Sequence, residues 1–322
     1  MYKTFLSCDW GTSSFRLRLI DTASGQILAA SFADEGIAAV FALWKQANND
    51  EKERIPFYLS VIQKHIKRIE QDAGNGTGSI PVIISGMASS SIGMYELPYT
   101  ELPFSLNGED LQYKMIEKTG EFPHDLVIIS GARTDTDVMR GEETQLIGCA
   151  NGGEAGRQIF IFTGTHSKHI TIAAGKAINT TTYMTGEFFE LLAQKSILSD
   201  SLEAGSGLED DQNKPAFEQG VKDSVSQNLL HTSFMVRTNQ LFKRLSKTAN
   251  YFYLSGLLIG TELGQLSNKE MDGITIVGDK KLTVNYLLAL KILSIGSAIT
   301  TADAATATIQ GQLAMYKQIY KR

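Results

Sequence analysis

The residues of this chain whose types and spacing could do chemistry begin with a short polar turn near the N-terminus. Asp9 stands at the end of a predicted strand, and Gly11, Thr12 and Ser13 follow it. A glycine beside hydroxyl residues lets backbone N–H groups approach an anion closely. A carboxylate at this position can hold Mg²⁺, directly or through water, because this hard cation prefers oxygen ligands. The turn therefore suits a phosphate and magnesium site, although an ordinary hairpin can carry the same residues.

A second turn of the same kind lies in the other half of the chain. Gly164 and Thr165 stand between strands predicted over residues 159–162 and 168–173. The first turn has the same setting, because the residues on either side of it also read as strands. Two such turns facing each other across a cleft are what the binding of a nucleotide's phosphates requires. Together they predict a nucleotide site.

Two carboxylates, Asp135 and Asp137, precede an apolar pattern that predicts a helix over residues 138–149. A kinase that acts on an alcohol needs a carboxylate to orient the hydroxyl group and accept its proton. An aspartate just before a helix is equally typical of an N-cap. The residues alone leave both interpretations open for each aspartate.

The elements that must position these residues follow a mixed α/β pattern. The first 33 residues predict an antiparallel meander, with strands over 4–9, 15–21 and 27–33. A glycine-rich loop, residues 74–79, lacks the Lys-Ser/Thr of a P-loop and is expected to be a plain surface loop. Gly278 ends the last predicted strand and could seat an adenine. Buried strands are predicted over 81–85, 126–129 and 274–277, and helices over 55–72, 187–198, 217–245 with a break, 254–263, 283–293 and 302–318.

Length and composition limit the class of protein. The chain has 322 residues and a formal net charge of −5, with 43% apolar residues. This length favours two domains, and the glycine-rich stretch 151–156 predicts domains over residues 1–150 and 151–322. The last helix of the second domain is a candidate to pack back on the first domain. The acidic balance argues against a nucleic-acid partner, and no apolar run is long enough for a membrane span. The N-terminus reaches Asp9 before a signal-peptide core could form, which predicts a cytoplasmic protein.

Several stretches, taken in order, resemble one enzyme family. The paired turns are similar to those of the actin/hexokinase/Hsp70 superfamily, and the chain as a whole resembles the 2-dehydro-3-deoxygalactonokinase family. The most distinctive stretch is 138–148, with its Arg-Gly-Glu-Glu-Thr-Gln run. The sequence departs from the family's pattern at Met94 and in the more charged segment 278–283. The other matching stretches are 9–16, Gly86 and Met87 with Ser90, Gly93, Pro98 and Tyr99, then 164–168, 184–187 and 254–260.

The resemblance implies a fold and a reaction. The fold is α/β, with two actin-like ATPase (ribonuclease H-like) domains around a central cleft that closes about a joint near residues 148–156. The reaction is ATP- and Mg²⁺-dependent phosphorylation of the 6-hydroxyl group of 2-dehydro-3-deoxy-D-galactonate. Its product is 2-dehydro-3-deoxy-6-phospho-D-galactonate, in galactonate catabolism. The same resemblance predicts a small-molecule sugar acid as partner and a homodimer.

The resemblance also implies roles for the nucleotide side. Asp9 is the Mg²⁺-side aspartate, and Glu142 is a second candidate that either holds the metal or fixes Arg140. The superfamily's catalytic aspartate falls in the interval that contains Asp135 and Asp137, and Asp137 is the first choice. The residues expected around the nucleotide are Gly11, Thr12 and Ser13 at the first turn, Gly164 and Thr165 at the second, and Gly278 on the adenosine side.

The sugar acid carries a carboxylate, so a cation should meet it. Arg16, Arg140 and Lys168 are the candidates, and arginine offers a planar, two-point fit to a carboxylate. On the strand pattern alone, Arg16 would be an outward-facing residue of its strand. Ser90 and Tyr99 are candidates for contacts to the sugar acid's hydroxyl groups.

Three alternatives stay open at this point. The first is a kinase for a related sugar or sugar acid, because pocket shape separates these substrates and sequence does not show it. The second is a nucleotide phosphohydrolase of the same superfamily, which would turn over ATP without an acceptor. The third is a non-catalytic binding protein, and Asp9, Asp137 and both glycine turns argue against it.

Overall fold

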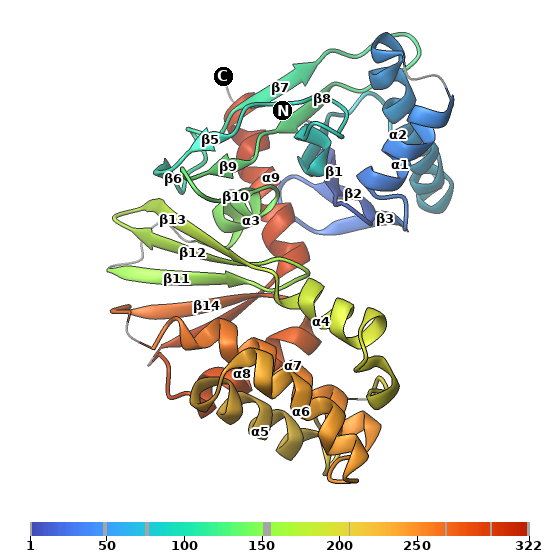
Figure 1. Cartoon of the computed structure of the whole chain (residues 1–322). Coiled ribbons are helices and arrows are strands. Elements are labelled where there is room, and N and C mark those ends of the chain that lie inside the picture. Colours follow the sequence, from blue (N-terminus) through green and yellow to red (C-terminus); the bar gives the residue numbers. More distant parts are fainter. Residues whose placement is uncertain are drawn as a thin grey trace. The chain divides into compact units, whose positions relative to one another are not determined.

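The chain divides into two compact units in a computed structural model (Figure 1). Unit 1 comprises residues 1–154, 175–180 and 305–322, and unit 2 comprises residues 155–174 and 181–304. Two segments of the second half belong to unit 1, in contrast to a simple division at residue 150. They are residues 175–180, which the sequence placed in the second domain, and residues 305–322, which hold the last helix that was expected to pack back on the first domain. Residues 75–76 of the glycine-rich loop and 151–155 of the expected joint lie outside the described residues. The structure describes residues 2–47, 50–74, 77–150, 156–205, 207–267, 269–296 and 298–320.

Unit 1 is built on a six-stranded sheet with the order β3-β2-β1-β4-β8-β7. The first three strands form the predicted antiparallel meander, and β4 and β8 continue the sheet parallel to β1. β4 and β8 are buried along their whole length, as is typical of parallel strands covered on both faces. The bounds are β1 (Thr4–Trp10), β2 (Phe15–Asp21), β3 (Ile27–Ala33), β4 (Val82–Gly86), β7 (Tyr113–Ile116) and β8 (Leu126–Ile129).

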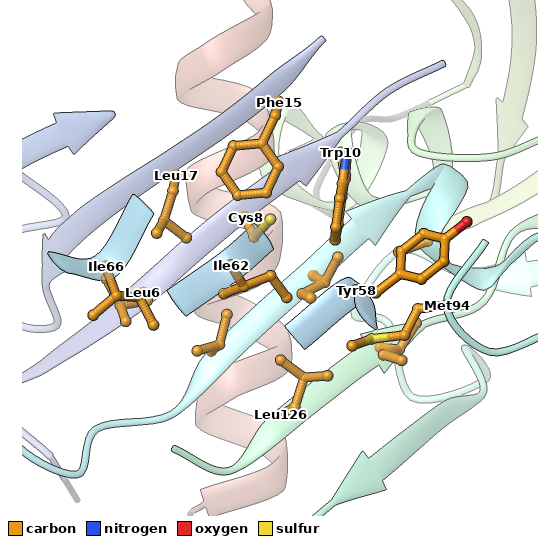
Figure 2. Packing of buried hydrophobic residues seen from close by; sticks show 14 of the residues in the cluster. Leu6, Cys8, Trp10, Phe15, Leu17, Tyr58, Ile62, Ile66, Met94 and Leu126 are labelled. Atoms are coloured by element: carbon orange, nitrogen blue, oxygen red, sulfur yellow. The ribbon is translucent and has the colours of Figure 1, made fainter. Parts of the chain in front are cut away.

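Helices cover both faces of this sheet. Two helices, α1 (Ile37–Ala47) and α2 (Glu51–Ala73), contribute to a core with one face of β1. Figure 2 shows this core, in which side chains of β1 meet side chains of α2. On β1's other side, the ring of Phe5 stacks on that of Tyr316, in α9 (Ala304–Tyr320), with centroids 5.4 Å apart. The labelled core residues are Leu6, Cys8, Trp10, Phe15, Leu17, Tyr58, Ile62, Ile66, Met94 and Leu126.

The predicted helix over 138–149 is wrong at its start. Residues Val138–Met139 form a short strand, β10, and helix α3 runs only over Glu142–Cys149. Gly141, which precedes the helix, has a φ of 114°, a conformation that a residue with a side chain rarely adopts. The apolar pattern did not reveal this break. β10 joins a small sheet with the order β10-β9-β5, where β9 is Ala132–Arg133 and β5 is Thr100–Glu101.

Helices α3 and α9 cross so closely that the backbone of one contacts the backbone of the other. A Cβ atom on Gly148 would lie 1.9 Å from the carbonyl oxygen of Ala307, and one on Gly311 would lie 1.8 Å from that of Thr144. Only glycine permits so close a crossing at these two positions. The crossing fixes the start of α3, which follows directly on Arg140 and Gly141.

Unit 2 repeats the strand order of unit 1. The six-stranded sheet that contains its strands has the order β15-β14-β11-β12-β13-β6, where β6 is Phe104–Ser105. Its first five strands match β8-β4-β1-β2-β3 strand for strand. β11 pairs antiparallel with β12 and parallel with β14, as β1 does with β2 and β4. The sequence did not predict β15 and expected a helix from residue 302. The bounds are β11 (Arg157–Phe162), β12 (Ser167–Ala173), β13 (Lys176–Tyr183), β14 (Gly273–Gly278) and β15 (Ile299–Asp303).

The helices of unit 2 gather around α7, whose middle is buried. α5 and α7 cross closely, because a Cβ on Gly220 would lie 2.2 Å from the carbonyl oxygen of Tyr253. The expected break in the helix over 217–245 falls at residues 227–228, where Asn228 caps α6 by accepting the N–H of Leu230. No helix among the described residues is long and apolar enough to cross a bilayer. The bounds are α4 (Thr185–Lys195), α5 (Asn213–Ser226), α6 (Leu229–Leu241), α7 (Lys247–Gly264) and α8 (Lys280–Ile292).

Candidate active site

The first turn of unit 1 is held in place by the helix that follows the meander. Gly11 donates its N–H to the carbonyl oxygen of Ser14 at 2.9 Å, which closes the turn. The carbonyl oxygens of Gly11 and Thr12 accept the N–H groups of Ile37 and Ala38, at the start of α1. The first N–H groups of a helix lack partners within it, so these contacts satisfy the helix and fix the turn together. The side chain of Thr12 is exposed, as is that of the next residue, Ser13.

Asp9 and Arg16 form an ion pair across the first two strands. The two residues are direct partners in the β1–β2 register, and Arg16 Nη1 lies 2.9 Å from Asp9 Oδ2. The Arg16 side chain is 45% exposed, as its strand position predicted. Exposed ion pairs contribute at most about 1 kcal/mol, so either partner can exchange the other for a ligand at little cost.

Arg140 is held between a serine and an aromatic ring. Its Nη1 donates to both the carbonyl and the hydroxyl oxygen of Ser89, each at 2.6 Å. Its guanidinium carbon lies 4.2 Å from the centroid of the Tyr99 ring, a cation–π contact. The small β10-β9-β5 sheet brings these side chains together, because Tyr99 precedes β5 and Arg140 follows β10.

The serine that contacts Arg140 is Ser89, which the sequence did not single out. Ser90 was a candidate for a different role, contact with the sugar acid's hydroxyl groups. The Ser90 hydroxyl donates to the carbonyl oxygen of Met87 at 2.7 Å and is buried, so it closes the short 3-10 turn after β4. Residues 89–91 are all serine, and sequence alone does not tell which of them faces the arginine.

Asp135 and Asp137 lie on the turn between β9 and β10. The Asp137 carboxylate accepts the N–H of Val138 at 2.7 Å, and its own N–H donates to the hydroxyl oxygen of Thr134 at 3.0 Å. The N-cap of α3 is Gly141, so neither aspartate caps that helix and the N-cap interpretation is wrong. Asp135 is exposed, and Asp137 is half-buried.

Two glutamates hold the corner that carries Arg140. Glu142 accepts the N–H of Arg140 at 3.0 Å, and Glu143 accepts the N–H of Gly141 at 2.7 Å. Burial, and then the charge of Glu142, raise the pKa of Glu143 to about 7. No group of three or more acidic, histidine or cysteine side chains among the described residues could hold a metal ion by itself.

Gly86 joins the first turn to this corner. Its φ is 94°, and a Cβ atom there would lie 2.7 Å from the carbonyl oxygen of Trp10. A Cβ on Gly141 would in turn lie 3.5 Å from the Cα of Gly86. The residue after Asp9 and the residue after Arg140 are therefore both packed against one glycine.

Unit 2 contains a cavity of about 1110 Å³. One part of its lining is aromatic and apolar, and another is made of glycines, hydroxyls and two lysines. Cavities of this size and mixed lining are typical of small-molecule sites. The lining includes Gly164, Thr165, Thr185, Gly186, Phe189, Leu208, Tyr251, Phe252, Ser255, Asp279, Lys280, Lys281 and Tyr286.

The second turn is braced by the start of α4. Glu187 donates its N–H to the carbonyl oxygen of Thr165 at 3.0 Å, and its carboxylate contacts Nε2 of His166. A Cβ atom on Gly186 would lie 2.6 Å from the carbonyl oxygen of Gly164. The turn and the helix start thus form one packed unit, and both line the cavity.

Two more of the residues that the sequence singled out, Lys168 and Gly278, lie in unit 2. Lys168 lies on β12 and is 7% exposed. Gly278 leaves room for Thr163, whose hydroxyl oxygen would lie 2.0 Å from a Cβ there. The cavity lining starts one residue later at Asp279, which caps α8 by accepting the N–H of Leu282. Lys280 makes this segment locally cationic, and a helix N-terminus with nearby lysines favours anions.

The repeated strand order and the glycine turn after the first strand of each unit define an actin-like ATPase fold of the sugar kinase and Hsp70 type. A solved structure with this fold is component A of (R)-2-hydroxyglutaryl-CoA dehydratase from Acidaminococcus fermentans. It is 11% identical, with a TM-score of 0.50, over 98% of this chain and 99% of that one.

The chain belongs to the 2-keto-3-deoxy-galactonokinase family, whose family model matches residues 9–315. It is 32% identical to a probable 2-dehydro-3-deoxygalactonokinase of Rhizobium meliloti (strain 1021), over 98% of this chain and 97% of that protein. It is 31% identical to the 2-dehydro-3-deoxygalactonokinase of Escherichia coli (strain K12), over 70% of this chain and 75% of that protein. A Sinorhizobium meliloti crystal structure, provisionally assigned the same activity, has a TM-score of 0.80 and 29% identity, over 99% of this chain and 97% of that one.

Proposed function

We propose that this protein transfers the γ-phosphoryl group of ATP to the 6-hydroxyl group of 2-dehydro-3-deoxy-D-galactonate in galactonate catabolism. Membership of the family makes the chain a kinase, a phosphotransferase with an alcohol group as acceptor. The observation that carries the proposal is the family match over residues 9–315. The cavity of unit 2, with a glycine turn and two lysines in its lining, supports ATP as the donor.

The substrate's carboxylate is proposed to bind at Arg140. Nη1 is held by Ser89, and neither Nε nor Nη2 has a hydrogen-bond partner within the described residues. A guanidinium group fixed on one side and stacked on Tyr99 is ordered before the ligand arrives, which lowers the entropy cost of binding. Arg16 is the second candidate, because its ion pair with Asp9 is exposed and easily exchanged.

Mg²⁺ is proposed to bind at Asp9, with Glu142 as the second candidate. Mg²⁺ usually keeps several waters and takes one or two carboxylates together with the phosphates of its nucleotide, so a ready-made protein cage is not required. Asp9 suits this role because its carboxylate is partly exposed beside a glycine turn. When bound, the ion would neutralise charge on the transferring phosphoryl group.

Asp137 is proposed as the base that orients the acceptor hydroxyl group, with Asp135 as the alternative. Asp137 is held by the turn on which it lies, through the N–H of Val138 and the hydroxyl of Thr134. Phosphoryl transfer depends mainly on positioning and charge stabilisation, so a fixed carboxylate suits the task. The exposed Asp135 lies two residues away on the same turn.

Measurement of ADP release with ATP and Mg²⁺ tests the proposal directly. The acceptor panel contains 2-keto-3-deoxy sugar acids, aldonic acids and hexoses. We expect turnover with 2-dehydro-3-deoxy-D-galactonate and little with the others. Preference for another acceptor would mean that the enzyme is a kinase for that acceptor. ADP release without any acceptor would favour a nucleotide phosphohydrolase.

A cytoplasmic location and a homodimeric state are further proposals that come from the sequence. Cell fractionation and analytical ultracentrifugation test them.

A further inference from the structure

A buried glutamate lies next to the cavity of unit 2, near the end of a helix whose middle is mostly apolar. Glu262 is on α7, and its side chain is 1% exposed. A buried carboxylate is costly unless donors surround it. Glu262 lies within the family match over residues 9–315, and no role for it follows from the reaction.

Four side chains from three other elements surround this carboxylate. On Oε1 it accepts hydrogen bonds from the Ser167 hydroxyl and from His169 Nε2, both at 2.7 Å. On Oε2 it accepts the hydroxyl of Tyr286 at 2.8 Å and the hydroxyl of Thr185. An ionised carboxylate offers about four lone-pair positions, so these contacts use its full capacity.

The carboxylate is held in its charged form. Burial alone would raise the pKa of Glu262, but the hydrogen bonds from His169, Thr185 and Ser167 lower it below the usual value of glutamate. A carboxylate can only accept, so Nε2 of His169 carries the proton of that contact. The other ring nitrogen, Nδ1, is buried without a partner in the part of the chain that the structure describes.

These contacts tie Glu262 to the parts of the cavity that would hold phosphates. Thr185 and Tyr286 both line the cavity. Thr185 is the first residue of α4, whose next two residues brace the turn at Gly164 and Thr165. Ser167 starts β12, directly after that turn.

We propose that Glu262 is a positioning residue of the nucleotide site, which holds the second phosphate turn, the start of α4 and Tyr286 of α8 in their binding geometry. The inference rests on the proposed function, because it assigns the cavity of unit 2 to the nucleotide. Glu262 touches neither the acceptor nor the reacting atoms. Its effect therefore reaches the nucleotide through Thr185, Tyr286 and the turn.

Glu262→Gln is the most specific substitution, because it keeps the shape of the side chain and removes two of the carboxylate's lone-pair positions. The new NH₂ group must face one of the two donor pairs. On the Oε1 side it would meet the N–H of His169, and Nε2 could accept only if the proton moved to Nδ1, which is buried without a partner in the described residues. The NH₂ is therefore expected on the Oε2 side, where the hydroxyls of Thr185 and Tyr286 must turn to accept it, and these are the residues that line the cavity.

The matched control is Asp223→Asn. Asp223 is a second buried carboxylate of unit 2, on α5, and it accepts the hydroxyl of Tyr253 and the amide of Gln219, both at 2.8 Å. It is not part of the lining of the nucleotide cavity. Both substitutions thus remove a buried charge from the same unit, but only one of them acts on the proposed nucleotide site.

The experiment measures the Kd of ADP with Mg²⁺ by calorimetry, the KM values for ATP and the sugar acid, and the unfolding temperature. We expect Glu262→Gln to raise the Kd of ADP and the KM for ATP by about 10- to 100-fold. The KM for the sugar acid should stay within about twofold, because its proposed site lies in unit 1. Asp223→Asn should lower the unfolding temperature and leave the Kd of ADP unchanged.

Ser167→Ala covers the case in which Glu262→Gln does not fold. It removes one donor without altering a cavity-lining residue, and we expect a smaller rise in the Kd of ADP. If both Glu262→Gln and Asp223→Asn only lower the unfolding temperature, the role of Glu262 is structural and the inference is wrong. If the unsubstituted chain does not bind ADP, the proposed function itself is wrong, which is a distinguishable result.

Discussion

Substitution of Gly164 tests whether the second turn binds phosphate through its backbone. A Cβ atom at Gly164 would meet nothing within 4 Å, and the backbone φ of this residue lies outside the left-handed region. Gly164→Ala should therefore fold as the unsubstituted chain does. The residue lines the cavity, however, so the new methyl group would occupy space that a phosphate needs to approach the turn.

The size of the effect follows from the contact that the methyl group would prevent. A hydrogen bond to a charged group contributes about 1.5–3 kcal/mol. At about 1.4 kcal/mol for each factor of ten, the loss of one such bond weakens ADP binding by roughly 10- to 150-fold. Adenosine has no phosphate, so its affinity should not change.

Calorimetry with ADP and with adenosine, beside thermal unfolding, measures this difference. Gly120→Ala is the matched control, because a Cβ at Gly120 also meets nothing within 4 Å and the residue lies in unit 1, outside the cavity lining. An unchanged Kd for ADP in Gly164→Ala would refute the assignment of this turn to phosphate binding. A large fall in its unfolding temperature would refute the premise that the position is open.

Three further predictions concern unit 1. Asp137→Asn should lower kcat by at least about 100-fold and change the KM for the sugar acid little, as expected for a base; steady-state kinetics measures both, and an unchanged kcat would transfer the role to Asp135. Arg140→Lys should raise the KM for the sugar acid by about tenfold or more and leave the Kd of ADP unchanged, because lysine lacks the planar, two-point fit; equal KM values would exclude Arg140 as the carboxylate site. The pKa of Glu143 is raised to about 7 from the usual 4.5. Between these two pH values the folded chain keeps the proton on this carboxyl group, whereas the unfolded chain loses it. The free energy of unfolding should therefore fall by about 3 kcal/mol as the pH rises from 4.5 to 7, and Glu143→Gln should remove this part of the slope. Urea unfolding of both chains between pH 4.5 and 8 measures this. If the free energy of unfolding has the same slope against pH in both chains, Glu143 is not the group responsible.

Local patterns were sufficient for much of the fold. The strands 15–21, 27–33 and 126–129 have the predicted bounds, because alternating or continuous apolar side chains report directly on which faces are buried. The break between α5 and α6 was also expected. The family could be named from the sequence, since its distinctive run over 138–148 is contiguous.

The arrangement of the site depended on contacts between distant segments. The sequence did not predict that 138–139 would be a strand, because that strand exists only by pairing with residues 132–133. The contact between Ser89 and Arg140 depends on where β10 places Arg140, because the two residues are 51 positions apart along the chain. The burial of Lys168 follows from the packing of β12, which no local pattern reports.

What the sequence by itself determined is therefore the class of each element, the two glycine turns and the family. These follow from residue types and short spacings. Only the tertiary structure decided that segment 175–180 belongs to unit 1, and that Glu262 accepts hydrogen bonds from β12, α4 and α8 beside one cavity. A single glutamate in an apolar helix gives no local signal of its partners. Those partners lie between 24 and 95 residues away along the chain, and folding alone brings them together.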